Sequence, residues 1–155
     1  MNKTCCFLGH RNINETEELK LKLIKTIENL IIDDKVDTFL FGSKSSFNSL
    51  CHKLVCALKE KYPHIKRIYV RAEYPHISKE YKDYLLCSFE DTYYPEKIIK
   101  SGKASYVERN YEMIDKGQFC VVYFNEKIAP TTRKSGTKIA LDYAIKKGKE
   151  IIMAL

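Results

Sequence analysis

The sequence predicts an α/β fold: one doubly wound, mostly parallel sheet with helices on both faces, as in Rossmann-like proteins. Strand-like and helix-like segments alternate along all 155 residues, a pattern that favours parallel strands joined by helical crossovers. The run FCVVYF, residues 119–124, is almost wholly apolar, as expected of a strand covered on both faces. Because no linker, repeat or low-complexity tract interrupts the pattern, we expect a single domain over residues 1–155.

The N-terminal part of the pattern is a strand, a helix and a second strand. Residues 4–8 are predicted to form a short strand that ends at Gly9. Asn14 is a candidate N-cap for the following helix, because the glutamates behind it suit the positive end of a helix. One face of this helix is apolar at helical spacing: Leu19, Leu23, Ile27, Leu30 and Ile31. Residues 36–41 are predicted to form the second strand.

The middle of the chain begins with a second amphipathic helix, for which Ser45 or Ser46 is the expected N-cap. Its apolar face carries Phe47, Leu50, Leu54 and Leu58. A third strand is predicted at residues 65–71. A short helix at 78–86 and a short strand at 89–94 are expected to follow.

The C-terminal part repeats the alternation twice. A helix is predicted over residues 103–116, with Val107, Tyr111 and Ile114 facing inward. The apolar strand at 119–124 leads into a polar loop. A helix and a last strand are then predicted at these ranges: 135–147 and 150–154.

The chain is basic, with a formal net charge of +7. Its lysines are dispersed rather than gathered in one block: Lys20, Lys22, Lys25, Lys59, Lys61, Lys146, Lys147 and Lys149. This dispersal favours solvated helix faces over a nucleic-acid surface, while small anionic ligands remain attractive partners. No apolar run reaches the length of a membrane span, and no signal-peptide pattern opens the sequence, so we expect a cytoplasmic protein without a membrane partner.

The cysteines and histidines indicate neither disulfides nor a metal site. None of the six cysteines forms a Cys-x-x-Cys pair, and most lie in apolar segments where a free cysteine acts as a small hydrophobe. The four histidines are scattered, which gives a zinc site little support. We therefore expect no metal and no required cofactor.

Four turns that follow predicted strands or open a predicted helix are suited to bind an anion. Glycine permits close approach of the backbone, and free N–H groups at a helix start attract phosphates. The candidate residues are Gly9, His10, Arg11, Gly42, Ser43, Lys44, Arg71, Glu73, Ser135, Gly136 and Thr137. Each turn alone is more simply explained as a tight turn or an N-cap. Ligands of such sheets bind at the carboxyl ends of the strands, so together the turns indicate a phosphate or pyrophosphate pocket.

Arg109 and Asn110, in the segment SYVERNYEMID, are further candidates. The arginine could pair with a phosphate and the asparagine could bond a ribose or a base edge, although a solvated helix face explains them equally well. Glu73 is either a general base, a ribose ligand or an exposed loop carboxylate. Tyrosines could stack on a base, the candidates being Tyr74, Tyr93 and Tyr94. The sequence lacks both a Gly-x-x-x-x-Gly-Lys-Ser/Thr loop and a Gly-x-Gly-x-x-Gly motif, which argues against a P-loop NTPase and an ordinary dehydrogenase.

The ordered set CCFLGHR, FLFGSKSSFNSL, YVERNYEMID, FCVVYF and SGTKIALDYAIKKGKEII resembles the SLOG superfamily of Rossmann-like proteins and, within it, the YpsA-like family. The resemblance covers nearly the whole chain. It implies a nucleotide or nucleotide-derived ligand, with Gly9-His10-Arg11 and Gly42-Ser43 bordering the pocket. It also implies that Arg109-Asn110 faces the pocket and that Ser135-Gly136-Thr137 holds the phosphate.

Two departures from the resembled families bear on activity. The second turn, which is often glycine-rich in this family, carries Lys44 and only one glycine. The phosphoribohydrolase branch resembles Pro-Gly-Gly-x-Gly-Thr-x-x-Glu at the last turn, whereas this chain has Ala140 three residues after Thr137. The missing carboxylate argues against cleavage of a glycosidic bond.

We therefore expect a binding or sensor module for a nucleotide-type small molecule. The alternative is a hydrolase or transferase acting on an N-glycosidic or phosphate bond, with Glu73, His10 or Glu108 as acid or base. Nucleic-acid binding ranks third. Because related folds often pair through helix faces, a homodimer is a further expectation.

Overall fold

The computed structural model describes residues 3–42, 45–99, 102–127 and 135–155. Within these residues strands and helices alternate. They are β1 (Lys3–Gly9), α1 (Glu17–Ile32), β2 (Val36–Phe41), α2 (Ser46–Lys61), β3 (Lys66–Val70), α3 (Lys79–Leu86), β4 (Asp91–Tyr93), α4 (Lys103–Lys116), β5 (Phe119–Tyr123), α5 (Gly136–Lys146) and β6 (Glu150–Met153).

The strands form one parallel sheet in the order β4-β3-β2-β1-β5-β6. The chain winds outward from β1 through β2 and β3 to β4, and α4 then carries it back to the other side of β1. The direction of winding therefore reverses between β1 and β5. In open α/β sheets this reversal opens a crevice at the carboxyl ends of the strands. The predicted fold class is confirmed.

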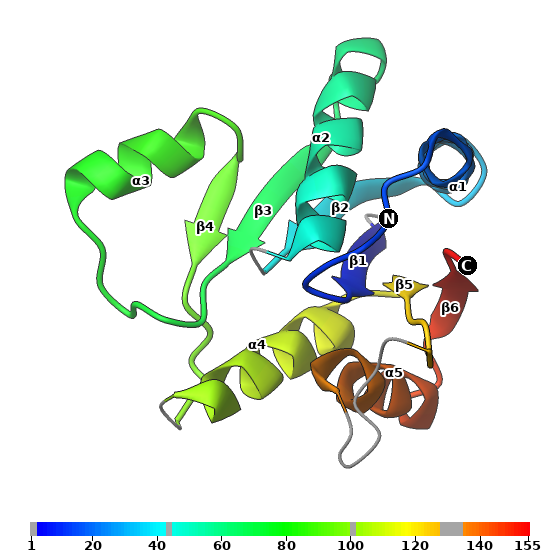
Figure 1. The fold of residues 1–155 in the computed structure, drawn as a ribbon. Helices are drawn as coiled ribbons and strands as arrows, with labels where there is room; N and C mark the ends of the chain where they lie inside the picture. Colours follow the sequence, from blue (N-terminus) through cyan, green and yellow to red (C-terminus); the bar gives the residue numbers. More distant parts are fainter. Residues whose placement is uncertain (1–2, 43–44, 100–101, 128–134) are drawn as a thin grey trace.

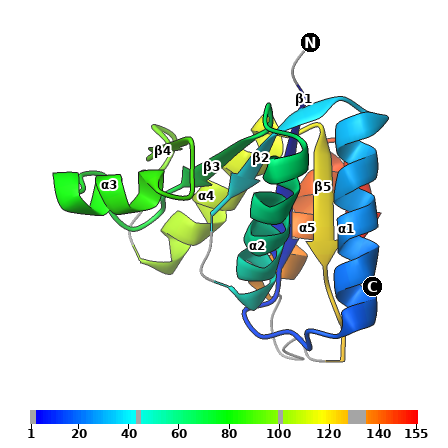
Figure 2. The ribbon, with the colours of Figure 1, turned by 90° about the horizontal axis from the view of Figure 1, so that it is seen from above.

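Helices cover both faces of the sheet. Figure 1 shows α1 and α2 above the strands and α4 and α5 below them, and the view in Figure 2 places α1 and α2 in front. Successive strand residues point to opposite faces, so Phe7 packs in the core under α1 and α2. Leu8, its neighbour, packs in the core under α4 and α5. The central strands therefore have no polar face, which explains their nearly continuous apolar sequences.

Serine or threonine side chains cap α1, α2, α3 and α5, whereas α4 begins after Gly102 without a side-chain cap. Ser45 Oγ accepts from Asn48 N at 3.2 Å, which confirms Ser45 as one of the two expected caps of α2. Ser135 Oγ accepts from Lys138 N at 3.1 Å and begins α5 in the same way. The prediction that Asn14 caps α1 was wrong. Thr16, not Asn14, accepts from Leu19 N at 3.1 Å, because Asn14 lies two residues too early to reach the first turn.

The inward face of α4 was predicted correctly only at Ile114. Ile114 is buried, but Val107 and Tyr111 are only half-buried. The buried polar residues of this helix are Ser105, Arg109 and Glu112. Glu112 Oε2 accepts from Tyr93 Oη at 2.8 Å, and Lys97 lies 3.3 Å from its other oxygen. This face of α4 therefore contains a polar side chain, Glu112, that is paired with residues of β4 and of the loop after it. The spacing of apolar residues along the sequence cannot reveal such a pairing.

Candidate functional site

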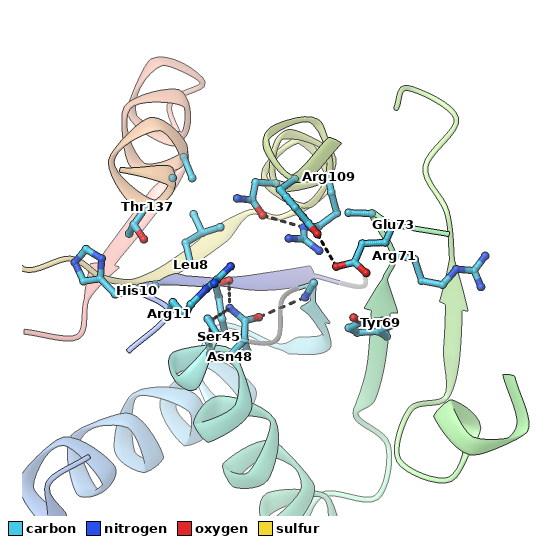
Figure 3. Close-up of a pocket in the computed structure, with 18 of the residues that line it drawn as sticks. Leu8, His10, Arg11, Ser45, Asn48, Tyr69, Arg71, Glu73, Arg109 and Thr137 are labelled. Atoms are coloured by element: carbon cyan, nitrogen blue, oxygen red, sulfur yellow. Dashed lines mark hydrogen bonds between the residues drawn. The ribbon is translucent and has the colours of Figure 1, made fainter. Parts of the chain in front are cut away.

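A cavity of about 750 Å³ opens at the carboxyl ends of β1, β2 and β3. The turns after these strands form one wall, while α4 and the start of α5 form the other (Figure 3). The volume lies within the range of small-molecule sites, about 300–1,000 Å³. The cavity lies beside the switch point of the sheet, where such folds bind their ligands.

Eleven of the residues proposed from the sequence lie in the lining of this cavity. They are Gly9, His10, Arg11, Gly42, Arg71, Glu73, Arg109, Asn110, Ser135, Gly136 and Thr137. Ser43 and Lys44 lie outside the described residues. Of the tyrosines proposed to stack on a base, Tyr74 lines the cavity; Tyr93 and Tyr94 are absent from its described lining.

The first turn of α5 presents backbone donors to the cavity. The Ser135 hydroxyl accepts a hydrogen bond from Lys138 N at 3.1 Å, and the Ser135 carbonyl accepts one from Ile139 N at 3.0 Å. Within the described part of the chain, the N–H groups of Gly136 and Thr137 have no such partner. Among the described residues outside its own helix and its chain neighbours, a Cβ at Gly136 would meet no atom within 4 Å, so this glycine leaves open space beside the donors.

Arg109 is the buried cation of the cavity, with only 3% of its surface exposed. It extends from α4 toward the strand ends (Figure 3), where Nε donates to Asn110 Oδ1 at 3.0 Å and Nη1 to the Val70 carbonyl at 3.5 Å. Desolvation by burial lowers the pKa of its guanidinium to about 10. No carboxylate described in the structure forms an ion pair with it. Glu73 attracts this charge only from beyond ion-pair distance, and a buried cation without a contacting anion is unfavourable until an anion joins it.

Gly42 makes room for Arg109. A Cβ at this position would lie 2.5 Å from Arg109 Cδ and 2.8 Å from both Arg109 Nε and Met113 Sδ. The glycine at the end of β2 therefore lets the arginine cross the turn at close range. In the structure Gly42 leaves space for the Arg109 side chain. The sequence analysis expected it instead to let the backbone come close to a ligand.

Asn48, which the sequence analysis did not single out, joins the ends of β1 and β2. Its Nδ2 donates to the Phe7 carbonyl at 3.2 Å, and its Oδ1 accepts from Gly42 N at 3.4 Å. It is 3% exposed. The start of α2 also holds the first turn, because Ser46 N donates to the Arg11 carbonyl at 2.7 Å. One buried amide thus fixes the relative positions of two turns of the cavity.

His10 is held in one tautomer. Its Nε2 accepts from Asn125 N at 2.8 Å, so the ring proton lies on Nδ1. Burial lowers the pKa of this imidazole, and protonation of Nε2 would also remove the hydrogen bond that it accepts from Asn125 N. At neutral pH His10 is therefore an uncharged donor at the cavity wall.

The far end of the cavity, after β3, is aromatic and polar. Glu73 is exposed and its Oε1 accepts from Tyr106 Oη at 2.6 Å. The Tyr106 ring lies 5.7 Å from the Arg109 guanidinium carbon, and the hydrogen bond to Glu73 raises the pKa of this phenol. Arg71 Nε is buried without a hydrogen-bond partner among the described residues. Further tyrosines complete this end: Tyr69, Tyr74 and Tyr81.

The described residues contain no group of three or more histidine, cysteine, aspartate or glutamate side chains that could hold a metal ion. Over the same residues, no helix is both long and apolar enough to cross a membrane.

Sequence comparison identifies no matching family model and no matching curated protein. The structure resembles that of DNA processing protein A from Helicobacter pylori, described for its single-stranded DNA binding mode, with a TM-score of 0.63 and 15% identity. The similarity covers 97% of this chain and 64% of that chain, so this chain spans less than two thirds of the neighbour. A similarity to S. aureus TarJ, solved with NADPH, has a TM-score of 0.47, 15% identity, and coverage of 87% and 41%. At this identity the first similarity shows a shared Rossmann-like fold.

Proposed function

We propose that this protein binds a nucleotide or nucleotide-derived small molecule in the cavity and acts as a sensor or regulatory module. The observation that carries the proposal is the burial of Arg109 beside an open cavity, without a carboxylate partner among the described residues. A phosphate would supply the missing negative charge and accept the parallel N–H donors of the guanidinium.

The start of α5 is the proposed phosphate end. The N–H groups of Gly136 and Thr137, the Thr137 hydroxyl and the helix dipole all favour an anion. The four tyrosines at the other end give a nucleobase flat surfaces, and one stacked base contributes about 1–3 kcal/mol. The order of motifs that resembles the SLOG superfamily and the YpsA-like family supports the same class of ligand.

Catalysis has weaker support from the geometry. A hydrolase needs an acid and a base that reach the same bond. Figure 3 shows His10 and Glu73 at opposite ends of the cavity, and Tyr106 already bonds one oxygen of Glu73. Ala140 is in the lining at the position where the phosphoribohydrolase pattern has a glutamate. Binding without turnover is therefore the function we favour.

Single-stranded nucleic acid is the alternative suggested by the similarity to DNA processing protein A. Nucleic-acid binding requires a continuous basic surface and depends strongly on salt. The dispersed lysines and the small-molecule volume of the cavity favour a small ligand instead. The affinity for single-stranded DNA can be measured by a gel shift at low salt. An affinity higher than that for every mononucleotide would make nucleic acid the favoured ligand.

A thermal-shift panel of nucleotides, cyclic nucleotides and ADP-ribose tests the proposed function. A ligand at about 100 times its dissociation constant adds about 2.7 kcal/mol to the unfolding free energy, or roughly 5–10 °C in a chain of this size. We expect at least one phosphorylated compound to give this shift and its nucleoside to give much less. If no member of the panel stabilises the protein, the proposal is wrong.

Gly136→Ala separates the ligand role of the α5 turn from its role as a helix start. The new methyl group clashes with no atom of the described residues, so the unfolding free energy should change by less than about 1 kcal/mol. The same methyl would occupy space that a phosphate needs to approach the backbone, so we expect binding about tenfold weaker. Titration of the best panel ligand measures the second effect. Unchanged affinity would show that this turn only begins a helix.

A further inference from the structure

A second polar cluster lies outside the cavity and joins α2, β3 and the segment before β4. Arg67 Nη1 donates to Cys56 Sγ at 3.2 Å. The other side of the guanidinium is held by Glu90, through Nε–Oε1 and Nη2–Oε2 distances of 3.0 and 2.6 Å. Because both carboxylate oxygens fix the guanidinium, its remaining nitrogen is held against the sulfur.

His52 lies one helical turn before Cys56, on the same face of α2. Its Nε2 is 3.1 Å from the Ser88 carbonyl, which can only accept, so Nε2 carries a proton. The ring stacks on Phe89 with centroids 4.2 Å apart and planes 6° apart. The ring is therefore held in place one helical turn from Cys56.

The charges around the sulfur favour its ionised form. Burial raises the pKa of the Cys56 thiol, but the hydrogen bond from Arg67 and the nearby His52 ring outweigh it and the net shift is downward. Burial lowers the pKa of His52, but the nearby Cys56 thiol and the hydrogen bond to the Ser88 carbonyl outweigh it and the net shift is upward. Lys59, 3.9 Å from Glu90, adds a further cation to the cluster. A thiolate beside an imidazolium is the form of cysteine that reacts as a nucleophile.

We propose that Cys56 is a reactive thiolate that hydroperoxides oxidise, with His52 as the proton donor. With hydrogen peroxide, the sulfur attacks one oxygen, an S–O bond forms and the O–O bond breaks. The thiolate loses two electrons and becomes a sulfenic acid. The departing hydroxide takes a proton from the His52 imidazolium and leaves as water.

Cys87 provides an internal control. It is more exposed than Cys56, but its thiol donates to the Asp83 carbonyl at 3.4 Å, and no cationic side chain of the described residues hydrogen-bonds its sulfur. The other cysteines are buried: Cys5, Cys6, Cys51 and Cys120. If exposure alone set reactivity, Cys87 would react first.

The test treats the native protein at pH 7 with limiting iodoacetamide and compares labelling rates by peptide mass spectrometry. We expect Cys56 to react at least about fivefold faster than Cys87, and the two rates to converge in guanidinium chloride. Limiting hydrogen peroxide followed by dimedone should place the sulfenic-acid adduct on Cys56. Faster native labelling of Cys87, or a dimedone adduct confined to it, would overturn the proposal.

His52→Gln tests the role of the imidazole, with Lys53→Gln as the matched control on the same helix. The first variant should slow labelling of Cys56 at pH 7 by about tenfold and move the midpoint of the rate–pH profile upward. The second removes an exposed charge and should leave the profile unchanged. If both variants retain the native profile, His52 does not activate the thiol. Circular dichroism of each variant confirms that it is folded.

Discussion

Arg109→Met should abolish most ligand binding without weakening the ligand-free protein. The variant removes the buried cation proposed to meet the phosphate, a loss of about 3 kcal/mol or more than 100-fold in dissociation constant. Methionine is apolar, flexible and able to fill the space of the arginine stem. Because burial already lowers the pKa of Arg109 to about 10, its removal should raise the unfolding free energy of the empty protein by about 1–3 kcal/mol.

Two measurements check this result: titration with the best ligand of the nucleotide panel, and denaturant unfolding of the empty protein. Arg109→Lys is the matched control, since it keeps the positive charge but lacks the planar set of guanidinium N–H donors. It should bind with intermediate affinity. A methionine variant that binds normally, or that loses stability while the lysine variant does not, would assign Arg109 to the fold rather than to the ligand.

Gly9→Ala should give the largest loss of stability of any single methyl addition proposed for this chain. The new Cβ would lie 2.3 Å from Phe47 Cδ2 and 2.6 Å from Phe47 Cβ. Phe47 is completely buried between the sheet and α2, so it cannot move away without displacing the helix. Overpacking of this kind costs about 1–3 kcal/mol, and the close approach to Cβ places this site at or above the upper end.

Chemical denaturation measures the loss, and Gly136→Ala is the control because its added Cβ has open space. The two variants add the same methyl group at two different turns of the cavity wall. Equal stabilities for both would contradict the close contact between β1 and α2. That contact also fixes the first cavity turn, so Gly9→Ala should weaken ligand binding as well.

The sequence predicted the fold and the cavity-lining turns because these follow from local patterns. Alternating periodicity placed the strands, and the parallel sheet then brought Gly9 and Gly42 to one edge. The same reasoning gave an incomplete account of these glycines. It explained them by backbone approach to a ligand, whereas their protein contacts are to Phe47 and Arg109, residues far away in the sequence.

Buried polar residues were the features that the sequence could not place. Asn48 occurs on a helix whose apolar pattern is complete without it, so nothing local indicates that it ties β1 to β2. Arg109 was equally compatible with a solvated face, because its burial depends on how α4 crosses the end of β2. The reactive cluster at Cys56 likewise needs β3 and the segment before β4 to approach α2.

The crystal structure of the complex with the most stabilising nucleotide of the panel tests the proposed function most directly. We predict a phosphate group within hydrogen-bonding distance of the Arg109 guanidinium or the N–H groups of Gly136 and Thr137, with the base against the tyrosines at the other end. A nucleotide bound outside this cavity, or one whose phosphates touch neither Arg109 nor the start of α5, would contradict the account.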